Sequence, residues 1–451
     1  MTMSGNINRQ SLPEGDVGPG RPQLLREFNA RRVLRLLRLH APCSQADLAR
    51  LSGLSSPTIS FAVADLLKKG LIERAGRGQS NGGRPPKMLR FNAKFGYVAG
   101  ADIEPSEVQL AIADLNGNLL AKLVRPADPH STPKSTAALV ASGLLGLMAQ
   151  HAIPPQRLLT LAAGVPGIVD TRNGIADSLP LFSSGWRSVR LRHLLEGTTK
   201  TLTVIENNVN LAAIGENRVG IARGVRDFVF MTVGEGVGGG VFVNGHLYHG
   251  SEWASGEIGF LYLPGTSRRP LVAKRLGPLE ETVCTAGVER SWRRLVDRAP
   301  KSNHLKARKA TAVEILGFAE RGDPRARRLL KQVSQKLAFT VANVCAVLNC
   351  SLVVFGGSIG SNPLVFETVR RTLERNEFPS PRLAMSILGK DATLLGAISL
   401  ALNAAERVVL PSSIGGSLSP RNTSGVLQPF LDVAPTEQLK NVRADQGARP
   451  S

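Results

Sequence analysis

Cysteine is scarce in this sequence, and its spacing excludes several classes of protein. The four cysteines are Cys43, Cys284, Cys345 and Cys350. They form no Cys-x-x-Cys pair, which argues against a disulfide scaffold and gives no zinc signature. A reduced, cytoplasmic location is the simpler interpretation.

Long apolar runs are also missing. The N-terminus lacks the apolar core of a signal peptide. The longest apolar stretch, 337–355, contains Asn343 and Asn349, so we expect a buried helix followed by a strand and not a membrane span.

Acidic residues are few, which makes the chain strongly basic. There are 35 Asp and Glu against 56 Lys and Arg, for a formal charge of +21. Residues 21–94 hold 15 basic and 4 acidic residues, so this block carries about half of the excess positive charge. A strongly basic surface favours an anionic partner, and we expect that partner to bind the N-terminal block. The 42% hydrophobic content and the length of 451 residues predict two or three folded domains.

The two ends of the chain differ from the part between them. Residues 1–22 and 408–451 are rich in Gly, Pro, Ser and Asn without hydrophobic periodicity, so we predict disordered tails.

Residues 23–94 have the pattern of three helices and a hairpin. The first helix is predicted from Asn29 to His40. The second opens at Ser44 with a capping-box pattern, and Gly53 makes the turn that follows it. The third begins after Ser55 and carries an apolar stripe at helical spacing: Ile59, Ala62, Val63, Leu66 and Leu67.

Two short strands around a Gly- and Arg-rich turn, 76–86, complete a winged helix-turn-helix. The side chains expected to contact DNA are Ser56, Pro57, Thr58, Ser60, Phe61, Lys68, Arg77 and Arg84. Phe61 lies opposite the apolar stripe and is expected to pack on thymine methyl groups. Two alternatives stay open: Phe61 packs on another helix, and the block is a helical bundle with a solvated basic face.

Residues 95–407 alternate strands, glycine turns and helices, which predicts an α/β architecture. The length exceeds one comfortable core, so we expect two lobes with a cleft between them. The first lobe is placed at about 95–215 plus 392–407, and the second at about 216–391.

Eight segments in order along the chain resemble the ROK family of transcriptional repressors. They include GGRPP at 82–86, GVPGIVD at 164–170, ENNVNLAAIGE at 206–216, GEGVGGGVFVNG at 234–245 and GEIG at 256–259. The resemblance implies a winged helix-turn-helix fused to a two-lobed sugar-kinase-like domain of the actin/ribonuclease-H type.

The family's kinases use the Asp of an Asn-Asp pair as general base, and this chain has Asn207-Asn208. An amide does not accept a proton near neutral pH, so the resemblance predicts no catalytic residue and no phosphoryl transfer. Glu104 and Glu235 stand in the two phosphate loops, where like charge would oppose a triphosphate. The alternative is that both point to solvent.

The resemblance also implies where a sugar and a zinc ion would bind. Its sugar-binding residues correspond here to Asn207, Asn208, Glu257 and a later Glu, either Glu280 or Glu281, of which we choose Glu281. Phe260 stands where the family has a zinc-linked His, so we predict no metal and no cofactor.

The sequence therefore predicts a DNA-binding regulator of carbohydrate-related genes with a kinase-like domain that has lost activity. We expect a homodimer or homotetramer on a pseudo-palindromic operator, and no membrane partner. A sugar-like inducer is one option for the cleft, and no small ligand is the other. The rivals are a constitutive DNA-binding protein whose second domain only oligomerises, and an active sugar kinase.

Overall fold

The computed structural model describes residues 22–79, 85–177, 185–266, 276–297, 308–374 and 380–410. Within them the chain forms two compact units, 22–91 with Leu410 and 92–409. The predicted disordered tails lie outside the described residues, except at their inner ends. There Pro22 begins a helix, and Val408 and Val409 end another.

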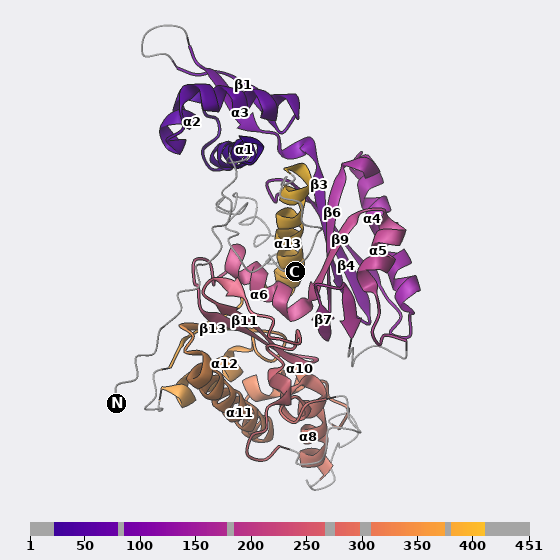
Figure 1. Cartoon of the computed structure of the whole chain (residues 1–451). Coiled ribbons are helices and arrows are strands. Elements are labelled where there is room, and N and C mark those ends of the chain that lie inside the picture. The colour runs from indigo at the N-terminus through magenta and orange to yellow at the C-terminus, as the bar shows by residue number, and fades with distance from the viewer. Residues whose placement is uncertain are drawn as a thin grey trace, which may run out of the picture. The chain divides into compact units, whose positions relative to one another are not determined.

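The first unit contains three helices and a two-stranded sheet (Figure 1). Its elements are α1 (Pro22–His40), α2 (Gln45–Ser52), α3 (Ser56–Lys68), β1 (Ile72–Arg77) and β2 (Lys87–Phe91). Helix α1 begins seven residues before the predicted start at Asn29, and the other elements lie where the sequence predicted them. The predicted winged helix-turn-helix is confirmed.

Local side-chain hydrogen bonds fix the helix starts in this unit. The Ser44 Oγ accepts from the Asp47 amide at 3.1 Å, and Asp47 Oδ2 accepts from the Ser44 amide at 3.0 Å. This is the predicted capping box. Gly53 ends α2 with φ of 68°, a left-handed conformation that costs glycine nothing. The apolar stripe of α3 is buried as predicted, with Leu67 only partly so.

The second unit is built on two five-stranded sheets. The first has the order β5-β4-β3-β6-β9 and the second the order β12-β11-β10-β13-β14. The strands of the first are β3 (Tyr97–Ile103), β4 (Glu107–Asp114), β5 (Leu119–Pro126), β6 (Leu158–Val165) and β9 (Leu202–Asn207). Those of the second are β10 (Phe228–Val233), β11 (Val237–Val243), β12 (His246–Leu247), β13 (Leu352–Gly356) and β14 (Arg382–Met385). A small hairpin of β7 (Ile168–Asp170) and β8 (Ile175–Asp177) follows β6.

Each sheet joins an antiparallel meander to parallel strands. In the first, β3 pairs antiparallel with β4 and parallel with β6, and β6 pairs parallel with β9. In the second, β10 pairs antiparallel with β11 and parallel with β13. The carboxyl ends of β3, β6 and β9 therefore meet at one edge, where ligands bind in open α/β sheets.

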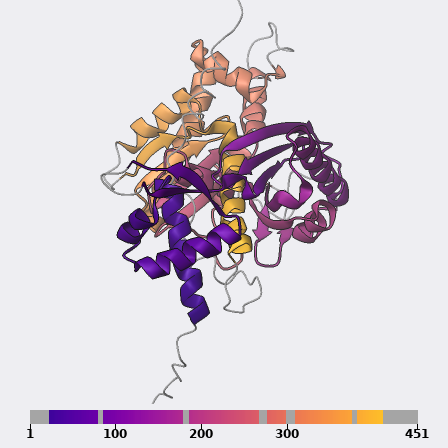
Figure 2. The same cartoon turned by 90° about the horizontal axis from the view of Figure 1, so that it is seen from above.

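Helices cover both faces of the first sheet. Helices α4 (Pro133–Gln150) and α5 (Leu191–Thr199) lie on one face, and α13 (Ala392–Val409) lies on the other (Figures 1 and 2). Helix α6 (Asn208–Arg218) packs on α13 and on β10 and β11 of the second sheet. The α6 and α13 pair thus connects the two sheets.

Two glycines allow α6 and α13 to approach closely. A Cβ on Gly396 would lie 1.8 Å from the Leu211 carbonyl oxygen, and one on Gly215 would lie 2.4 Å from the Ala392 carbonyl oxygen. Neither position has room for a side chain.

The other described α-helices share one hydrophobic core with the second sheet: α7 (Glu280–Val283), α8 (Thr285–Asp297), α10 (Ala312–Glu320), α11 (Pro324–Leu348) and α12 (Pro363–Leu373). Trp292, Leu337 and Phe355 lie in the core between these helices and the sheet. The apolar stretch 337–355 is the end of α11 followed by β13, as predicted. One described helix, α13, is long and apolar enough to cross a membrane, and half of that window is buried within the protein.

Candidate functional site

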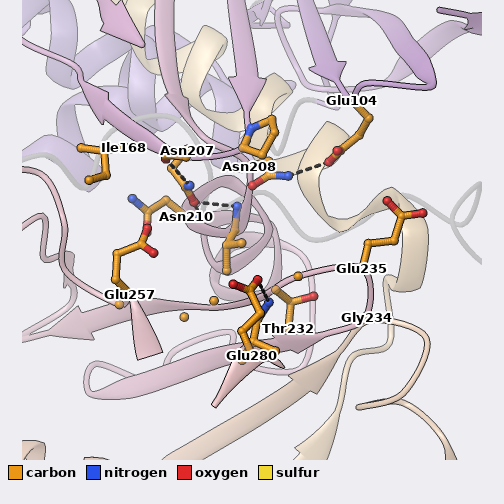
Figure 3. Close-up of a pocket in the computed structure, with 18 of the residues that line it drawn as sticks. Glu104, Ile168, Asn207, Asn208, Asn210, Thr232, Gly234, Glu235, Glu257 and Glu280 are labelled. Carbon is orange, nitrogen blue, oxygen red and sulfur yellow. Dashed lines mark hydrogen bonds between the residues drawn. The ribbon is translucent and has the colours of Figure 1, made fainter. Parts of the chain in front are cut away.

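A cavity of about 1130 Å³ opens between the two sheets of the second unit (Figure 3). Its walls come from the turn after β3, the loop after β6, the start of α6, the turn between β10 and β11, and segment 253–260. Five of the residues that the sequence placed in the sugar site or the phosphate loops line it: Glu104, Asn207, Asn208, Glu235 and Glu257.

Asn207 lines the cavity, but its side chain already has structural partners. Its Oδ1 accepts from the amides of Val209 and Asn210 at 2.8 and 3.0 Å, which makes Asn207 the N-cap of α6. Its Nδ2 donates to the Gly167 carbonyl at 2.8 Å. Asn207 therefore joins α6 to the loop after β6, and only its second amide proton is left for a ligand.

Asn208 and Glu104 hydrogen-bond to each other in the cavity wall. The Asn208 Nδ2 donates to Glu104 Oε1 at 2.6 Å (Figure 3). Burial raises the pKa of Glu104 to about 7, the hydrogen bond from Asn208 opposes this rise, and the charge of Glu235 adds to it. Both carboxylates line the cavity, but Glu104 is half-buried and Glu235 is exposed. The alternative that both point away to solvent is therefore wrong for Glu104 and stays open for Glu235.

Glu280, and not Glu281, is the later glutamate of the cavity. Glu280 accepts from the amides of Val237 at 3.0 Å and Gly277 at 3.3 Å, and it lines the cavity, whereas Glu281 does not. Our choice of Glu281 was wrong because the two neighbours differ in side-chain direction by about 100° at the start of α7. Sequence spacing alone does not resolve that difference.

Glu257 faces the cavity beside Glu280. Burial raises the pKa of Glu257 to about 7, and the charge of Glu280 adds to the rise. Burial likewise raises the pKa of Glu280, against the two backbone amides that hydrogen-bond it. Among the described residues, the side-chain carboxylate of Glu257 has no hydrogen bond or ion pair, although its backbone carbonyl accepts from the Phe260 amide at 3.1 Å.

Glu206 and His249 form an ion pair that the sequence did not predict. Buried Glu206 accepts from the Asn207 amide at 2.8 Å and from Asn210 Nδ2 at 2.9 Å, and its other oxygen lies 2.7 Å from His249 Nε2. Burial lowers the pKa of His249, but the charge and hydrogen bond of Glu206 outweigh it and raise that pKa overall. The pair fixes segment 244–253 against the start of α6. The only sign of this ion pair in the sequence was Glu206 itself, the first residue of the ENN motif.

No metal site is evident in the described part of the chain. No group of three or more His, Cys, Asp or Glu there is arranged to hold an ion. Phe260 lines the cavity and is 42% exposed. The absence of zinc stays a prediction.

In the first unit, α3 exposes most of the residues proposed for DNA contact. Ser56, Pro57, Ser60, Phe61 and Lys68 are exposed on it, and Arg77 is exposed on β1. Thr58 is partly buried, and its hydroxyl lies 2.8 Å from the Ser55 hydroxyl. Arg84 lies outside the described residues.

Two neighbours of this helix were missed. Ser60 Oγ donates to Gln45 Oε1 at 3.0 Å, which places an exposed amide from the start of α2 beside α3. The Arg26 guanidinium lies 5.0 Å from the centre of the Phe61 ring, which is still 56% exposed. Phe61 thus contacts α1, as the alternative has it, and keeps an exposed face; its packing on thymine methyl groups stays a prediction.

Comparisons with known proteins agree with this architecture. The sequence profile of the ROK family matches residues 98–404. The chain belongs to the ROK family. A winged helix-turn-helix DNA-binding profile matches residues 29–73.

The relatives of this ROK protein include regulators and kinases. The xylose repressor of Bacillus subtilis (strain 168) is 27% identical over 386 residues, covering 84% of this chain and 96% of the repressor. The transcriptional dual regulator NagC of Escherichia coli (strain K12) is 24% identical and covers 77% of this chain and 84% of its own. The glucokinase of Halalkalibacterium halodurans is 25% identical over 66% of this chain and 93% of its own.

A solved structure of a ROK transcriptional regulator, a homologue of the E. coli MLC protein, has the same fold. It superimposes with a TM-score of 0.71 at 20% identity and covers 86% of this chain and 98% of its own. The ROK hexokinase of Thermus thermophilus matches with a TM-score of 0.57 at 26% identity, over 69% of this chain and 99% of its own. The predicted two-lobed sugar-kinase fold is thereby confirmed.

Proposed function

We propose that this protein is a cytoplasmic transcriptional repressor of carbohydrate-related genes, whose ROK domain senses a sugar-like effector and does not phosphorylate it. The observation that carries the non-enzymatic part is the hydrogen bond between Asn208 and Glu104. The winged helix-turn-helix and the likeness to the xylose repressor and NagC support the regulatory part.

Phosphoryl transfer from ATP to a sugar needs a base for the hydroxyl and neutral or positive groups around the phosphates. Asn208 supplies an amide, and its one described side-chain contact is with a carboxylate. Glu104 and Glu235 add negative charge at the same end of the cavity (Figure 3). Like charges about 4 Å apart cost about 4 kcal/mol each at an effective dielectric of 20, so a triphosphate is disfavoured by several powers of ten.

DNA recognition is assigned to the exposed side of α3. Ser56, Ser60 and Lys68 lie on it, and Gln45 stands beside Ser60. A glutamine amide can bind adenine through two hydrogen bonds, and serine can contact any base. Arg77 on β1, and Arg84 in the wing, would contact phosphates and supply salt dependence.

One such module reads few bases, so we propose a homodimer or homotetramer on a pseudo-palindromic operator. The test is capture of sheared genomic DNA on the immobilised protein, followed by mass measurement on the recovered site. We expect two protomers per site, and genes of carbohydrate use beside it. One protomer per site would contradict the oligomeric part.

The kinase rival is favoured by one observation, the similarity to the glucokinase, and is tested directly. The purified protein is incubated with ATP and a panel of hexoses, pentoses and amino sugars, and ADP is measured. We expect no turnover above a protein-free control. Measurable turnover would make the protein an enzyme with an appended DNA-binding domain.

The effector separates the sensor from a constitutive DNA-binding protein. A ligand releases DNA only if it binds one state of the protein better than the other. Glu257→Ala is expected to abolish release by an inducing sugar while operator affinity stays unchanged. Induction that persists in this variant would remove Glu257 from the site.

A further inference from the structure

The cavity wall has a strong excess of acidic groups. Among the described residues that line it, six are acidic: Glu104, Glu107, Asp177, Glu235, Glu257 and Glu280. Two are basic, Arg187 and Lys390, and both are exposed. This balance is the reverse of the whole chain, which carries +21. A phosphorylated ligand would meet net repulsion throughout this cavity.

Two acceptor groups of the cavity wall are without a partner. The Glu257 carboxylate has no hydrogen bond or ion pair among the described residues, and Asn208 Oδ1 has no hydrogen bond either. Both face the cavity (Figure 3). Acceptors of this kind require donors from the ligand, and hydroxyl groups supply them, whereas a phosphate dianion does not.

Two aromatic residues of the segment that carries Glu257 also line the cavity. Trp253 and Phe260 line the cavity on either side of Glu257 in sequence. Phe260 keeps 42% of its surface exposed there. An exposed phenyl ring lining a cavity marks an apolar subsite, because covering it with ligand removes it from water.

Close backbone and ring contacts constrain the conformation of this segment. The Gly239 amide donates to the Gly256 carbonyl at 2.7 Å, and a Cβ on Gly256 would lie 1.8 Å from the Gly239 carbonyl oxygen. Trp253 has φ of 62°, a strained conformation for a bulky residue, and its ring lies 5.2 Å from His249 and 5.8 Å from the Arg172 guanidinium. Strain of this kind concentrates at ligand clamps.

We infer that the cleft binds an uncharged glycoside, with sugar hydroxyls donating to Glu257 and Asn208 and an apolar aglycone packing against Trp253 and Phe260. The inference rests on the proposed function and adds the ligand class. A free sugar is the poorer fit, because its hydroxyls opposite Phe260 would lose water without gaining a partner. The cavity of about 1130 Å³ also exceeds what one sugar ring fills.

Calorimetric titration of the full-length protein tests this with three forms of each of three sugars. The probes are the free sugar, its phosphate and its phenyl β-glycoside, for xylose, glucose and N-acetylglucosamine. In at least one series we expect the phenyl glycoside to bind about tenfold more tightly than the free sugar. We expect the phosphate to bind more weakly than either.

Phe260→Ala is expected to remove most of this preference and leave free-sugar affinity unchanged. Phe260→Leu is expected to retain part of it, which keeps the test valid if the alanine variant folds poorly. Tyr262→Ala is the matched control, because Tyr262 is 59% exposed and does not line the cavity.

The possible failures are distinguishable. Equal affinity of free sugar and phenyl glycoside, unchanged by Phe260→Ala, would overturn the inference and leave the proposed sugar sensor standing. Tightest binding by a phosphate would overturn it as well. Binding by none of the probes would contradict the inference together with the effector part of the proposed function.

Discussion

At the scale of single residues, the cavity is defined by carboxyl groups that are costly to ionise. Glu104 and Glu257 both have a pKa raised to about 7, at opposite ends of the cavity (Figure 3). Burial is the main cause at each, and a second carboxylate adds to it, Glu235 in one case and Glu280 in the other. The protein keeps these groups at a cost in stability, which is typical of binding sites.

Restoring a carboxylate at position 208 should destabilise the protein without restoring catalysis. Asn208→Asp places a second carboxyl group at hydrogen-bond distance from Glu104, which Asn208 contacts at 2.6 Å. At about pH 8 we expect the free energy of unfolding to be about 1–3 kcal/mol lower than in the native protein. Near pH 5 the two carboxyl groups should share a proton, which removes most of this destabilisation. Denaturant unfolding at the two pH values measures this.

The matched control is Asn208→Asp combined with Glu104→Gln, which restores a donor and acceptor pair. This double variant should regain the stability lost at about pH 8. A single variant as stable as the native protein at that pH would show that the two side chains do not contact each other in solution.

Glu257 should make stability depend on pH in a direction unusual for an acid. Its pKa is about 7 in the folded protein, against 4.5 for a glutamate in water. Between these two pH values the folded state therefore holds a proton that the unfolded state has lost. The free energy of unfolding therefore falls as pH rises from 4.5 to 7, and above pH 7 Glu257 causes no further change.

Glu257→Gln removes the titrating group. The variant should match the native protein near pH 4.5 and be more stable by about 3 kcal/mol at about pH 8. Glu252→Gln, at an exposed position, is the control and should leave the stability unchanged at both pH values. Parallel stability curves for Glu257→Gln and the native protein would contradict the buried environment of Glu257.

At the scale of elements, the contact between α6 and α13 carries the arrangement of the two sheets. Because α13 lies on the first sheet and α6 on the second, their spacing sets the width of the cleft. Glycines at 215 and 396 allow that spacing, since each faces a carbonyl oxygen of the other helix. Asn207 and Asn208 sit at the start of α6, so the same packing places the site.

Gly396→Ala should therefore destabilise the second unit. The new Cβ would lie 1.8 Å from the Leu211 carbonyl oxygen, and backbone cannot move aside as a side chain can. Overpacking of this kind costs about 1–3 kcal/mol or more. Thermal unfolding measures the loss.

The control is Gly146→Ala in the interior of α4, where a Cβ would meet nothing within 4 Å. This change should stabilise the protein by up to about 1 kcal/mol, since alanine favours helix over glycine. Equal effects of the two substitutions would mean that the helices are not in close contact.

At the scale of the whole molecule, charge is divided by function. The chain carries +21, and about half of the excess lies in residues 21–94. The ROK cavity has the opposite sign, with six acidic residues against two basic ones among the described residues that line it. The basic excess and the acidic cavity therefore lie in different parts of one chain.

This division predicts how DNA binding depends on salt. Affinity should fall steeply with ionic strength, and Arg77→Ala should weaken operator and non-specific DNA similarly while reducing the salt slope by about 1. Fluorescence anisotropy across a salt series measures both.

Arg325→Ala, on the ROK domain, is the control and should leave the slope unchanged. A loss confined to operator DNA in Arg77→Ala would instead make Arg77 a base-reading residue.

The sequence by itself determined the local structure and the family. The capping box at Ser44, the left-handed turn at Gly53 and the stripe of α3 depend on neighbours within a few residues, so the sequence predicts them without the fold. The ordered motifs also sufficed to predict the ROK architecture and the missing base at Asn208.

Only the tertiary structure decided which of these residues meet. Asn208 and Glu104 are 104 positions apart, and nothing in either local sequence indicates that one hydrogen-bonds the other. The choice of Glu280 over Glu281, and the contact of Phe61 with Arg26, likewise depend on side-chain direction after packing. Local propensity is set by adjacent residues, whereas a site is assembled by contacts between distant ones, which exist only once the helices and sheets have packed.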